Sequence, residues 1–305
     1  MIRKQGTVIR STGSWYTVMT SDQEIIECKI KGRFRIKGLR TTNPVAVGDH
    51  VEIEISPSGD AVIIDINERK NYIVRKATKL SKATHIIASN LDQAIIIVSL
   101  IKPRTSTGFI DRFLTTAEAY HIPAYVVFNK YDIYDAKTKE QLEYYVNVYE
   151  NIGYNCLVTS VPDQMHLKQF KNMLAGKVSL LAGHSGVGKS ALINAVDPSL
   201  NLKEGLISEY HEKGKHTTTF AEMFELNFGG FIIDTPGIKE FGLVAFEKEE
   251  LGQRFPEMRE RMHHCRFNNC LHINEPGCAV LQALAKNEIA EFRYLNYLNM
   301  LENLM

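Results

Sequence analysis

The sequence contains no long run of apolar residues. None of its stretches approaches the roughly 18 consecutive apolar residues of a membrane-spanning helix. The charged residues that follow Met1 do not lead into the apolar segment of a secretory signal peptide. These absences predict a soluble protein of the cytoplasm with no membrane partner. A length of 305 residues is enough for two or three domains.

Net charge is also small, because 36 Lys and Arg residues face 35 Asp and Glu residues. The basic residues are nevertheless unevenly placed. Residues 1 to about 70 have the short alternating runs of a small β-barrel. Within them, every odd position from 29 to 37 is basic and the even positions are apolar or glycine. A pleated strand would put these basic side chains on one face: Lys29, Lys31, Arg33, Arg35 and Lys37.

That basic face suits the phosphate backbone of a nucleic acid. The alternative is an exposed strand whose charges prevent edge pairing with other chains. Further positive charge comes from the following linker, at Arg75, Lys76, Lys79 and Lys82.

Cysteine is scarce and unevenly distributed, with five residues in the chain. Cys28 and Cys156 stand alone in strand-like stretches, whereas the other three form the pattern C-x4-C-x-H-x5-C with one histidine. Three thiolates and one imidazole make a closed tetrahedral set that suits structural zinc. A disulfide is disfavoured in a reducing compartment, and unrelated buried cysteines remain the alternative. The predicted ligands are Cys265, Cys270, His272 and Cys278.

The neighbours of this cluster fit the same prediction. Pro276 and Gly277 would let the chain turn back to the last ligand. His263 and His264 adjoin Cys265 too closely to replace the predicted histidine ligand. We therefore expect both of them at the surface, where they could face RNA.

A glycine-rich segment, GHSGVGKS, runs from Gly183 to Ser190. A strand-like run precedes it at 177–181, and an amphipathic helix start follows it at 190–196. This is the arrangement of a phosphate-binding loop, whose backbone N–H groups and helix N-terminus face the phosphates. Lys189 would reach the β and γ phosphates, and Ser190 would offer a hydroxyl to Mg2+. The alternative is a glycine-rich turn that carries a lysine by chance.

Two further motifs argue against that alternative. NKYD, from Asn129 to Asp132, follows the apolar run 124–128, and DTPG, from Asp234 to Gly237, ends the apolar run 231–234. The carboxyl ends of strands are where α/β sheets bind ligands. The Asp132 carboxylate can accept bonds from N1 and N2 of guanine, and adenine lacks that donor pair. Asp234 can hold Mg2+ through water, and the Gly237 N–H can sense the γ phosphate.

The order of these motifs is unusual. In an ordinary G domain the phosphate loop comes first and NKxD comes after DxxG, whereas here NKYD precedes the loop and DTPG follows it. The sequence therefore predicts an α/β, circularly permuted P-loop GTPase domain that uses GTP rather than ATP.

The remaining parts of the nucleotide site are less strongly marked. The strand-like run 155–159 ends at Ser160, where GTPases carry a small residue that contacts the guanine carbonyl. Families often have alanine after that serine, and this chain has Val161, so position supports Ser160 more than pattern does. In the switch loop GKHTTT, residues 214–219, we favour Thr218 as the Mg2+ ligand, with Thr217 next.

Ile238 follows DTPG, at the position where Ras-like GTPases place the glutamine that orients the attacking water. Isoleucine cannot orient water, so intrinsic hydrolysis should be slow until a partner orders the switches. His216, beside the switch threonines, is our candidate for the water-positioning group, and a solvated loop histidine is the alternative.

Near the C-terminal end, a helical stripe predicts core packing. Tyr294 and Tyr297 lie off that stripe, and we expect them to be exposed, with a partner surface as the alternative. The stripe consists of Ile289, Phe292, Leu295, Leu298 and Leu301.

Other function classes fit less well. A metabolic P-loop enzyme such as a kinase would need an acidic motif for a phosphoryl acceptor, and none is visible. A non-enzymatic RNA-binding module would not explain the presence of the three nucleotide motifs. Among GTPases, the alternative is a factor for another RNA assembly, such as the large subunit or a translation complex.

The chain resembles the small-ribosomal-subunit-dependent GTPase A (RsgA) family over nearly its whole length. The resemblance rests on five motifs that occur in the order and spacing of that family: NKYD, GHSGVGKS, GKHTTT, DTPGIKEFGL and C-x4-C-x-H-x5-C. The resemblance implies an N-terminal OB-fold barrel at 1–70, a permuted GTPase domain at 71–246 and a mainly helical zinc domain at 247–305. It also implies late assembly of the 30S subunit, with the GTP-bound protein on 16S rRNA near the decoding region and release on hydrolysis. We expect a monomer that binds no DNA.

These motifs predict three groups of site residues. The catalytic candidates are Lys189, His216 and Thr218, and the magnesium ligands are Ser190 and Thr218. Residues expected to contact GTP or GDP are Asn129, Lys130, Tyr131, Asp132, Ser160, Gly183, His184, Ser185, Gly186, Val187, Gly188, Lys189, Ser190, Ala191, Asp234 and Gly237.

The permutation suggests how the domains could communicate. Along the chain, the switch strands run on toward the zinc domain, and the guanine-side strands begin next to the barrel. Nucleotide state could then reorient two RNA-binding ends, although coupling requires an element with two arrangements.

Overall fold

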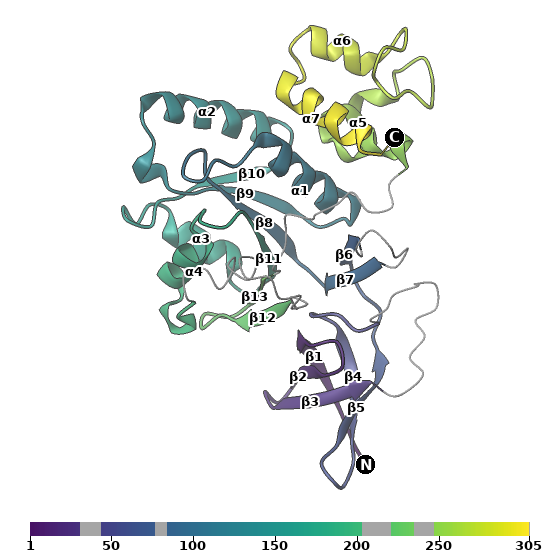
Figure 1. The fold of residues 1–305 in the computed structure, drawn as a ribbon, viewed down its shortest axis with the longest axis vertical. Coiled ribbons are helices and arrows are strands. Elements are labelled where there is room, and N and C mark those ends of the chain that lie inside the picture. Colours follow the sequence, from purple (N-terminus) through teal and green to yellow (C-terminus); the bar gives the residue numbers. More distant parts are fainter. Residues whose placement is uncertain (31–43, 77–83, 203–220, 235–246, 305) are drawn as a thin grey trace, which may run out of the picture.

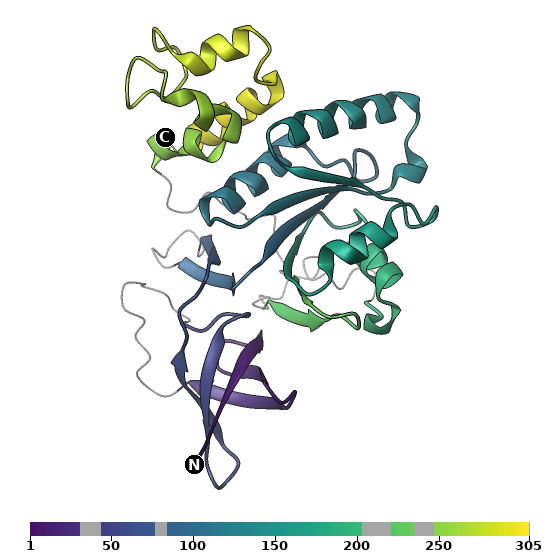
Figure 2. The same ribbon diagram turned by 180° about the vertical axis from the view of Figure 1, so that it is seen from behind.

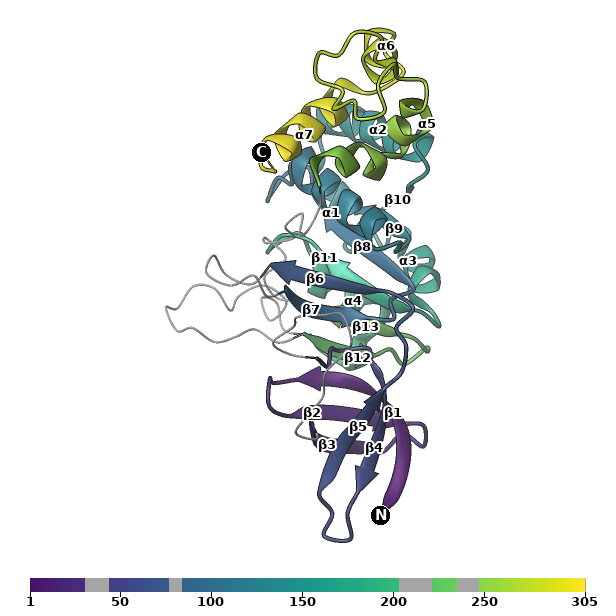
Figure 3. The ribbon, with the colours of Figure 1, turned by 90° about the vertical axis from the view of Figure 1, so that its right-hand side faces the viewer.

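The computed structural model describes residues 1–30, 44–76, 84–202, 221–234 and 247–304, with only the backbone described at 75–76 and 84–85 (Figure 1). These parts form an elongated molecule (Figure 3). A small barrel lies at one end, helices lie at the other, and an α/β sheet lies between them. Most of the predicted basic strand (31–37), the linker lysines Lys79 and Lys82, the switch loop 214–219 with His216, Thr217 and Thr218, and Gly237 and Ile238 lie outside the described residues.

Five strands form the N-terminal barrel, as predicted. They are β1 (Ile2–Ser11), β2 (Tyr16–Thr20), β3 (Ile25–Ile30), β4 (His50–Ile55) and β5 (Ala61–Ile66). Their order is β1-β2-β3-β5-β4, and pairing of β4 with β1 closes the sheet, which is the arrangement of an OB-fold. Alternate side chains fill the interior, and the lone Cys28 is one of them.

The central sheet has the strand order β10-β9-β8-β11-β13-β12. Its strands are β8 (Gln93–Val98), β9 (Ala124–Phe128), β10 (Asn155–Val158), β11 (Val178–Ala182), β12 (Glu222–Glu225) and β13 (Phe231–Asp234). All are parallel except β12, which is antiparallel to β13 and forms the predicted hairpin with it. The carboxyl ends of β9, β11 and β13 therefore meet at one edge, which brings NKYD, the phosphate loop and Asp234 together.

Helices cover both faces of this sheet (Figure 2). On one face lie α1 (Thr107–Ala119) and α2 (Ala136–Asn151), and on the other lie α3 (Leu167–Leu174) and α4 (Lys189–Val196). Strand β8 has apolar side chains on both faces. Ala94, Ile96 and Val98 belong to the core under α1 and α2, whereas Ile95 and Ile97 belong to the core under α3 and α4. Its near-continuous apolar run is typical of a parallel strand buried on both faces. Two short 3-10 helices complete the region, η1 (Tyr131–Ile133) and η2 (Pro198–Leu200).

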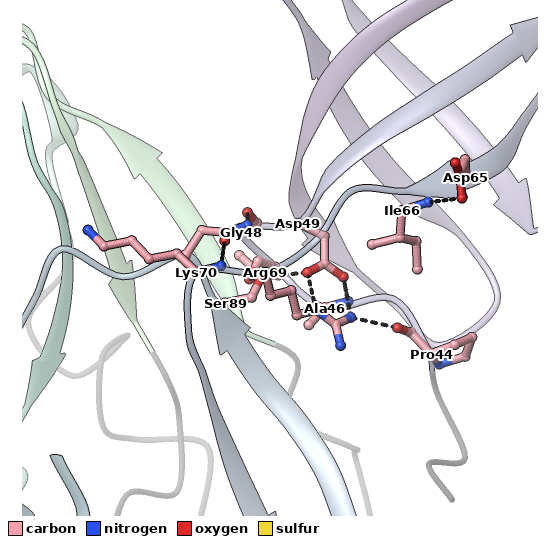
Figure 4. Close-up of polar contacts among 11 residues, drawn as sticks. Pro44, Ala46, Gly48, Asp49, Asp65, Ile66, Arg69, Lys70 and Ser89 are labelled. Carbon is pink, nitrogen blue, oxygen red and sulfur yellow. Dashed lines mark hydrogen bonds and ion pairs between the residues drawn. The ribbon is translucent and has the colours of Figure 1, made fainter. Parts of the chain in front are cut away.

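The stretch expected to be a linker instead contains a small antiparallel sheet of β6 (Tyr72–Lys76) and β7 (Thr84–Ser89). A buried ion pair beside it fixes the barrel (Figure 4). Asp49, just before β4, accepts bonds from Nε and Nη2 of Arg69, both at 2.6 Å, and one from the Ser89 hydroxyl at 2.6 Å. A bidentate arginine–carboxylate pair is directional, so this contact sets the angle at which the barrel leaves the β6-β7 sheet.

The C-terminal helical unit, residues 247–304, contains η4 (Lys248–Arg254), α5 (Pro256–Met262), α6 (Ala279–Ala285) and α7 (Glu291–Glu302). The predicted stripe is confirmed at Ile289 and Leu301, which are buried, and is wrong at Leu295, which is 49% exposed. Tyr294 and Tyr297, which we expected at the surface, are 8% and 1% exposed. Their hydroxyls reach backbone carbonyls inside the unit, and that polar contact lets a tyrosine take a buried position.

The barrel and the C-terminal helical unit have different neighbours in space from those they have along the chain. Barrel strand β1 pairs with β12, where Arg10 lies opposite Glu222, although β12 follows the predicted switch loop. The C-terminal helical unit packs on α1 and, through Phe292, on α2, the two helices that cover one face of the sheet. These spatial neighbours differ from the neighbours along the chain, because the order of strands in a sheet does not follow their order in the sequence.

Candidate functional site

The phosphate loop lies between β11 and α4, as its strand–loop–helix context predicts. Gly183, Gly186 and Gly188 all have positive φ, at 145°, 80° and 94°. A Cβ on Gly183 would collide with the carbonyl of Ile97, and one on Gly188 would collide with the Asn129 amide. The loop can therefore approach its neighbours this closely only with glycine at these two positions.

Lys189 opens α4 and is 5% exposed. Its ammonium donates to the carbonyls of Gly183, at 2.7 Å, and His184, at 2.9 Å. Burial lowers the pKa of Lys189 to about 8, and the nearby Asp234 carboxylate offsets only part of that shift. The loop thus holds a poorly solvated cation at its centre, where we expect it to bind phosphate.

This environment makes nucleotide affinity depend on pH. An anionic phosphate beside Lys189 would raise its pKa well above 8, so the bound form holds the proton more tightly than the free form. We therefore expect nucleotide affinity to be highest below about pH 7 and to fall as the pH rises through about 8. Titration of GDP should show an affinity about tenfold weaker at pH 9 than at pH 7. Calorimetry at pH 8.5 in two buffers should show uptake of about three quarters of a proton.

A matched variant isolates the lysine. Lys189→Arg keeps a cation that does not titrate in this range, so its binding, even if weaker, should take up little or no proton at pH 8.5. Equal proton uptake by both proteins would contradict the assignment to Lys189.

Asn129 joins the guanine side of the site to the phosphate loop. Its Nδ2 donates to the carbonyl of Val187 at 3.0 Å, and its Oδ1 accepts from the Thr159 hydroxyl at 3.0 Å. The Tyr134 hydroxyl donates to the Asn129 carbonyl at 2.7 Å. Asn129 is buried, so its amide acts as a rigid connection between the two halves of the site.

Two other NKYD side chains, those of Lys130 and Asp132, lie at the end of β9 and make specific polar contacts. Lys130 has a φ of 68°, and its ammonium donates to the carbonyl of Lys102 at 2.7 Å. Asp132 is exposed and accepts from the Ser160 hydroxyl at 2.9 Å. Ser160 also lies 3.0 Å from Asp163. The structure thus brings Ser160 next to Asp132, as its position in the sequence predicts, and leaves the carboxylate accessible to a base.

Changing Asp132 to asparagine should alter base preference. The amide offers one acceptor and one donor, so it opposes the N2 amine of guanine but suits the carbonyl that xanthine carries there. We expect GDP affinity to fall about 10–100-fold, the value of hydrogen bonds to a charged group, and xanthosine diphosphate affinity to rise. Asp135→Asn, at the exposed cap of α2, is the matched control and should change neither affinity. Unchanged preference in Asp132→Asn would contradict the base contact.

One part of the site carries no motif. The loop after β8 lies against the phosphate loop, because a Cβ on Gly186 would lie 3.5 Å from Pro103. Phe109, in the first turn of α1, stacks its ring on His184 with centroids 4.0 Å apart. Only its place at the carboxyl end of a buried strand could have indicated this loop from the sequence.

The predicted magnesium ligands are partly described. Ser190 is 7% exposed at the start of α4, and Asp234 is 8% exposed at the end of β13, where it pairs in register with Leu181. A hydroxyl and a carboxylate are the oxygen donors that Mg2+ prefers. These two residues therefore fit the ion, and Thr218 stays a prediction.

The Cys/His cluster is assembled as predicted, with the four ligand atoms of Cys265, Cys270, His272 and Cys278 within 4.8 Å of one another. The Sγ atoms of Cys265 and Cys278 lie 3.9 Å apart, and His272 Nδ1 lies 3.3 Å from the Cys278 sulfur and 3.7 Å from that of Cys265. Bonds of 2.3 Å to sulfur and 2.0 Å to nitrogen in a tetrahedron place ligands roughly 3.5–3.8 Å apart. The cluster therefore fits zinc.

Surrounding groups hold the cluster in shape. Glu275 accepts from the backbone N–H groups of Leu271, Ile273 and Asn274, which closes the loop between the last two ligands. The Tyr294 hydroxyl donates to the His272 carbonyl and that of Tyr297 to the Leu271 carbonyl, both at 2.7 Å. Sequence reasoning missed these supports. Gly277, with a φ of 73°, makes the expected turn, and His263 and His264 are exposed as expected.

Comparisons with known proteins agree with this geometry. Two family models match the chain, the RsgA N-terminal domain over residues 5–63 and the RsgA GTPase over residues 66–244. The small ribosomal subunit biogenesis GTPase RsgA of Phocaeicola vulgatus is 54% identical over 299 residues, which cover 98% of this chain and 96% of that protein. The protein of that name from Flavobacterium johnsoniae is 53% identical over 97% of this chain and 92% of its own length.

Two solved structures share the whole architecture. YjeQ from Thermotoga maritima superposes with a TM-score of 0.80 and 35% sequence identity, covering 99% of both chains. YloQ, described as a circularly permuted GTPase, gives a TM-score of 0.75 and 30% identity, covering 99% of this chain and 95% of its own. The permuted order of motifs read from the sequence is thus confirmed by structures of the same order.

Proposed function

The chain belongs to the RsgA GTPase family, and on that premise we propose that it binds the small (30S) ribosomal subunit late in maturation and hydrolyses GTP to GDP and phosphate to leave it. The observation that carries this proposal is the single connected nucleotide site. Asn129 joins the guanine side to the phosphate loop at Val187, in a chain whose close relatives are named as GTPases of that subunit.

Each residue at this site has a separate task. Asp132 would read guanine, and Lys189 would bind the β and γ phosphates from the position its carbonyl contacts give it. Ser190 and Asp234, with Thr218, would hold Mg2+, which supplies positive charge to the phosphates when bound. His216 would position the attacking water in place of the glutamine that Ile238 replaces.

The barrel supports 16S rRNA as the partner molecule. Trp15, the one tryptophan of the chain, is 46% exposed, and the Lys29 ammonium lies 4.3 Å from its ring centroid. An exposed aromatic ring beside a cation suits unpaired bases and their phosphates. We place the protein in the cytoplasm as a monomer. In the described part of the chain, no helix has the length and apolar content needed to cross a bilayer.

Purified ribosomal subunits test the proposal. The chain alone should hydrolyse GTP slowly, and small subunits should raise the rate by about a hundredfold or more, which asks less of the partner than the roughly 10³–10⁵-fold that an arginine finger supplies. Large subunits are the control and should have no effect. Stimulation by the large subunit alone would favour a role on another RNA assembly, and stimulation by neither would contradict the ribosomal role while leaving the GTPase assignment intact.

A further inference from the structure

Helix α1 contacts the phosphate loop at its first turn and the C-terminal helical unit along its length. We propose that the C-terminal helical unit positions the phosphate loop through α1, with Phe109 and Asn296 as positioning residues for nucleotide binding. This inference rests on the proposed role of the loop in binding guanine nucleotides. It concerns residues that no nucleotide motif contains.

The phosphate-loop end of this connection is an aromatic stack. The rings of Phe109 and His184 lie 4.0 Å apart at an interplanar angle of 28°. Phe109 is itself fixed, because its N–H donates to the hydroxyl of Ser106, the N-cap of α1, at 3.2 Å. The phosphate loop has positive φ at three glycines, so packing from outside the loop stabilises its conformation. Helix α1 provides that packing through Phe109.

The other end is a buried polar cluster. Asp111, fully buried on α1, accepts from Arg293 Nη1 at 2.6 Å, Asn296 Nδ2 at 2.5 Å and the Tyr149 hydroxyl at 2.8 Å. The remaining side of the Arg293 guanidinium binds Glu257 of α5, with Nε–Oε1 at 2.7 Å and Nη2–Oε2 at 3.1 Å. Because these groups are buried, a shift of α1 relative to α7 would break charged hydrogen bonds that water cannot replace.

The first turn of α1 also contacts α7 directly, next to Phe109. A Cβ on Gly108 would lie 3.2 Å from Asn296 Oδ1, so α7 abuts the residue immediately before Phe109. Asn296 thus contacts α1 at Gly108 and at Asp111, which precede and follow Phe109 in the sequence. The first turn of α1 is therefore held between the phosphate loop and α7.

The same helix, α7, reaches the metal cluster. Tyr294 and Tyr297 donate to the carbonyls of His272 and Leu271, and they lie within one turn of Arg293 and Asn296. A partner that binds the C-terminal helical unit and shifts α7 would therefore change nucleotide affinity. By linkage, nucleotide would change the affinity for that partner by the same factor.

Nucleotide dissociation from the full-length protein tests the connection. Stopped-flow release of a fluorescent GDP should be about five- to tenfold faster in Phe109→Leu than in the unmodified chain. Phe113→Leu is the matched control, since Phe113 is buried on the same helix, one turn beyond the residue that stacks on His184. Phe109→Tyr keeps the ring and should restore slow release. Equal release from the two leucine variants would overturn the proposal.

A second pair of variants tests the distant end of the connection. Asn296→Ala, at a half-buried residue, should also speed release several-fold, whereas Asn299→Ala, exposed on the same helix, should not. The effects of Phe109→Leu and Asn296→Ala should be non-additive, because both act on one turn of α1. Additive effects, or no effect of Asn296→Ala, would overturn the proposal. Failure of the unmodified chain to bind GDP would instead reject the proposed function.

Discussion

Loss of the metal from the Cys/His cluster should unfold the C-terminal helical unit while the barrel and the central sheet stay folded. This unit is short, and its four ligands come from the loop between α5 and α6 and from the residue before α6. Natural domains below about 70–80 residues often add a metal or disulfides to their apolar core. The cysteines carry no disulfide among the described residues.

The expected effect is large because metal binding and folding are coupled at such sites. Structural zinc contributes apparent binding free energies of about 10–16 kcal/mol in small zinc domains, far more than a single packing contact. Burial raises the pKa of the Cys270 and Cys278 thiols, so these two sulfurs would be protonated without the metal. The loop would then keep its hydrogen bonds to Tyr294 and Tyr297 but would lose the bonds to metal that join its ligands.

Cys265→Ser, compared with Cys156→Ser, checks this expectation. Both cysteines are half-buried, and the chemical change is the same, but only the first removes a ligand. Cys265→Ser should lose its stoichiometric zinc and its hydrogen-exchange protection in α6 and α7, while Cys156→Ser should keep both. A Cys265→Ser protein with one zinc and full protection would show that the cluster does not hold the unit together.

Replacement of Arg293 by alanine should lower the free energy of unfolding by about 3–5 kcal/mol, the cost of leaving buried charges unpaired. Arg293 is 1% exposed and forms ion pairs with two buried carboxylates, those of Asp111 (0% exposed) and Glu257 (3% exposed). Without the guanidinium, both would remain buried with like charge. Burial already raises the pKa of Asp111, so acid should restore part of the stability by protonating it.

Urea unfolding monitored by hydrogen exchange in α1 and α7 measures this loss. Arg259→Ala is the control, because Arg259 pairs with Glu118 across the same interface at 2.8 Å but is 48% exposed. Solvent screening limits such a pair to less than about 1 kcal/mol. If the two variants lost the same stability, the buried cluster would not be the main contact between α7 and the central sheet.

Much of the nucleotide site could be predicted because its information is local. Asn129, Lys189 and Asp234 each follow or end a short apolar strand, and parallel strands bring their carboxyl ends to one edge of the sheet. The four metal ligands lie within 14 residues, from 265 to 278. In both cases spacing along the chain is enough to indicate proximity in space.

The supports of the site could not be predicted, because their partners are far apart in the sequence. Nothing near Asp111 indicates that Arg293 will neutralise it, and nothing near His184 indicates that Phe109 will stack on it. Tyr294 and Tyr297 were misplaced for a different reason. A tyrosine has an apolar ring and a polar hydroxyl, so its burial depends on whether a carbonyl lies within reach, and helical spacing carries no information about that.

The contact between Asp111 and Arg293 also bears on how the chain is made. The two residues are 182 positions apart, so at translation rates of 5–20 residues per second Arg293 emerges roughly 10–40 s after Asp111. During that interval the carboxylate is hydrated, and the aromatic surface of Tyr145 and Tyr149 that later receives Phe292 is uncovered. The nascent chain thus exposes an aromatic surface on α2 until α7 has been synthesised and covers it.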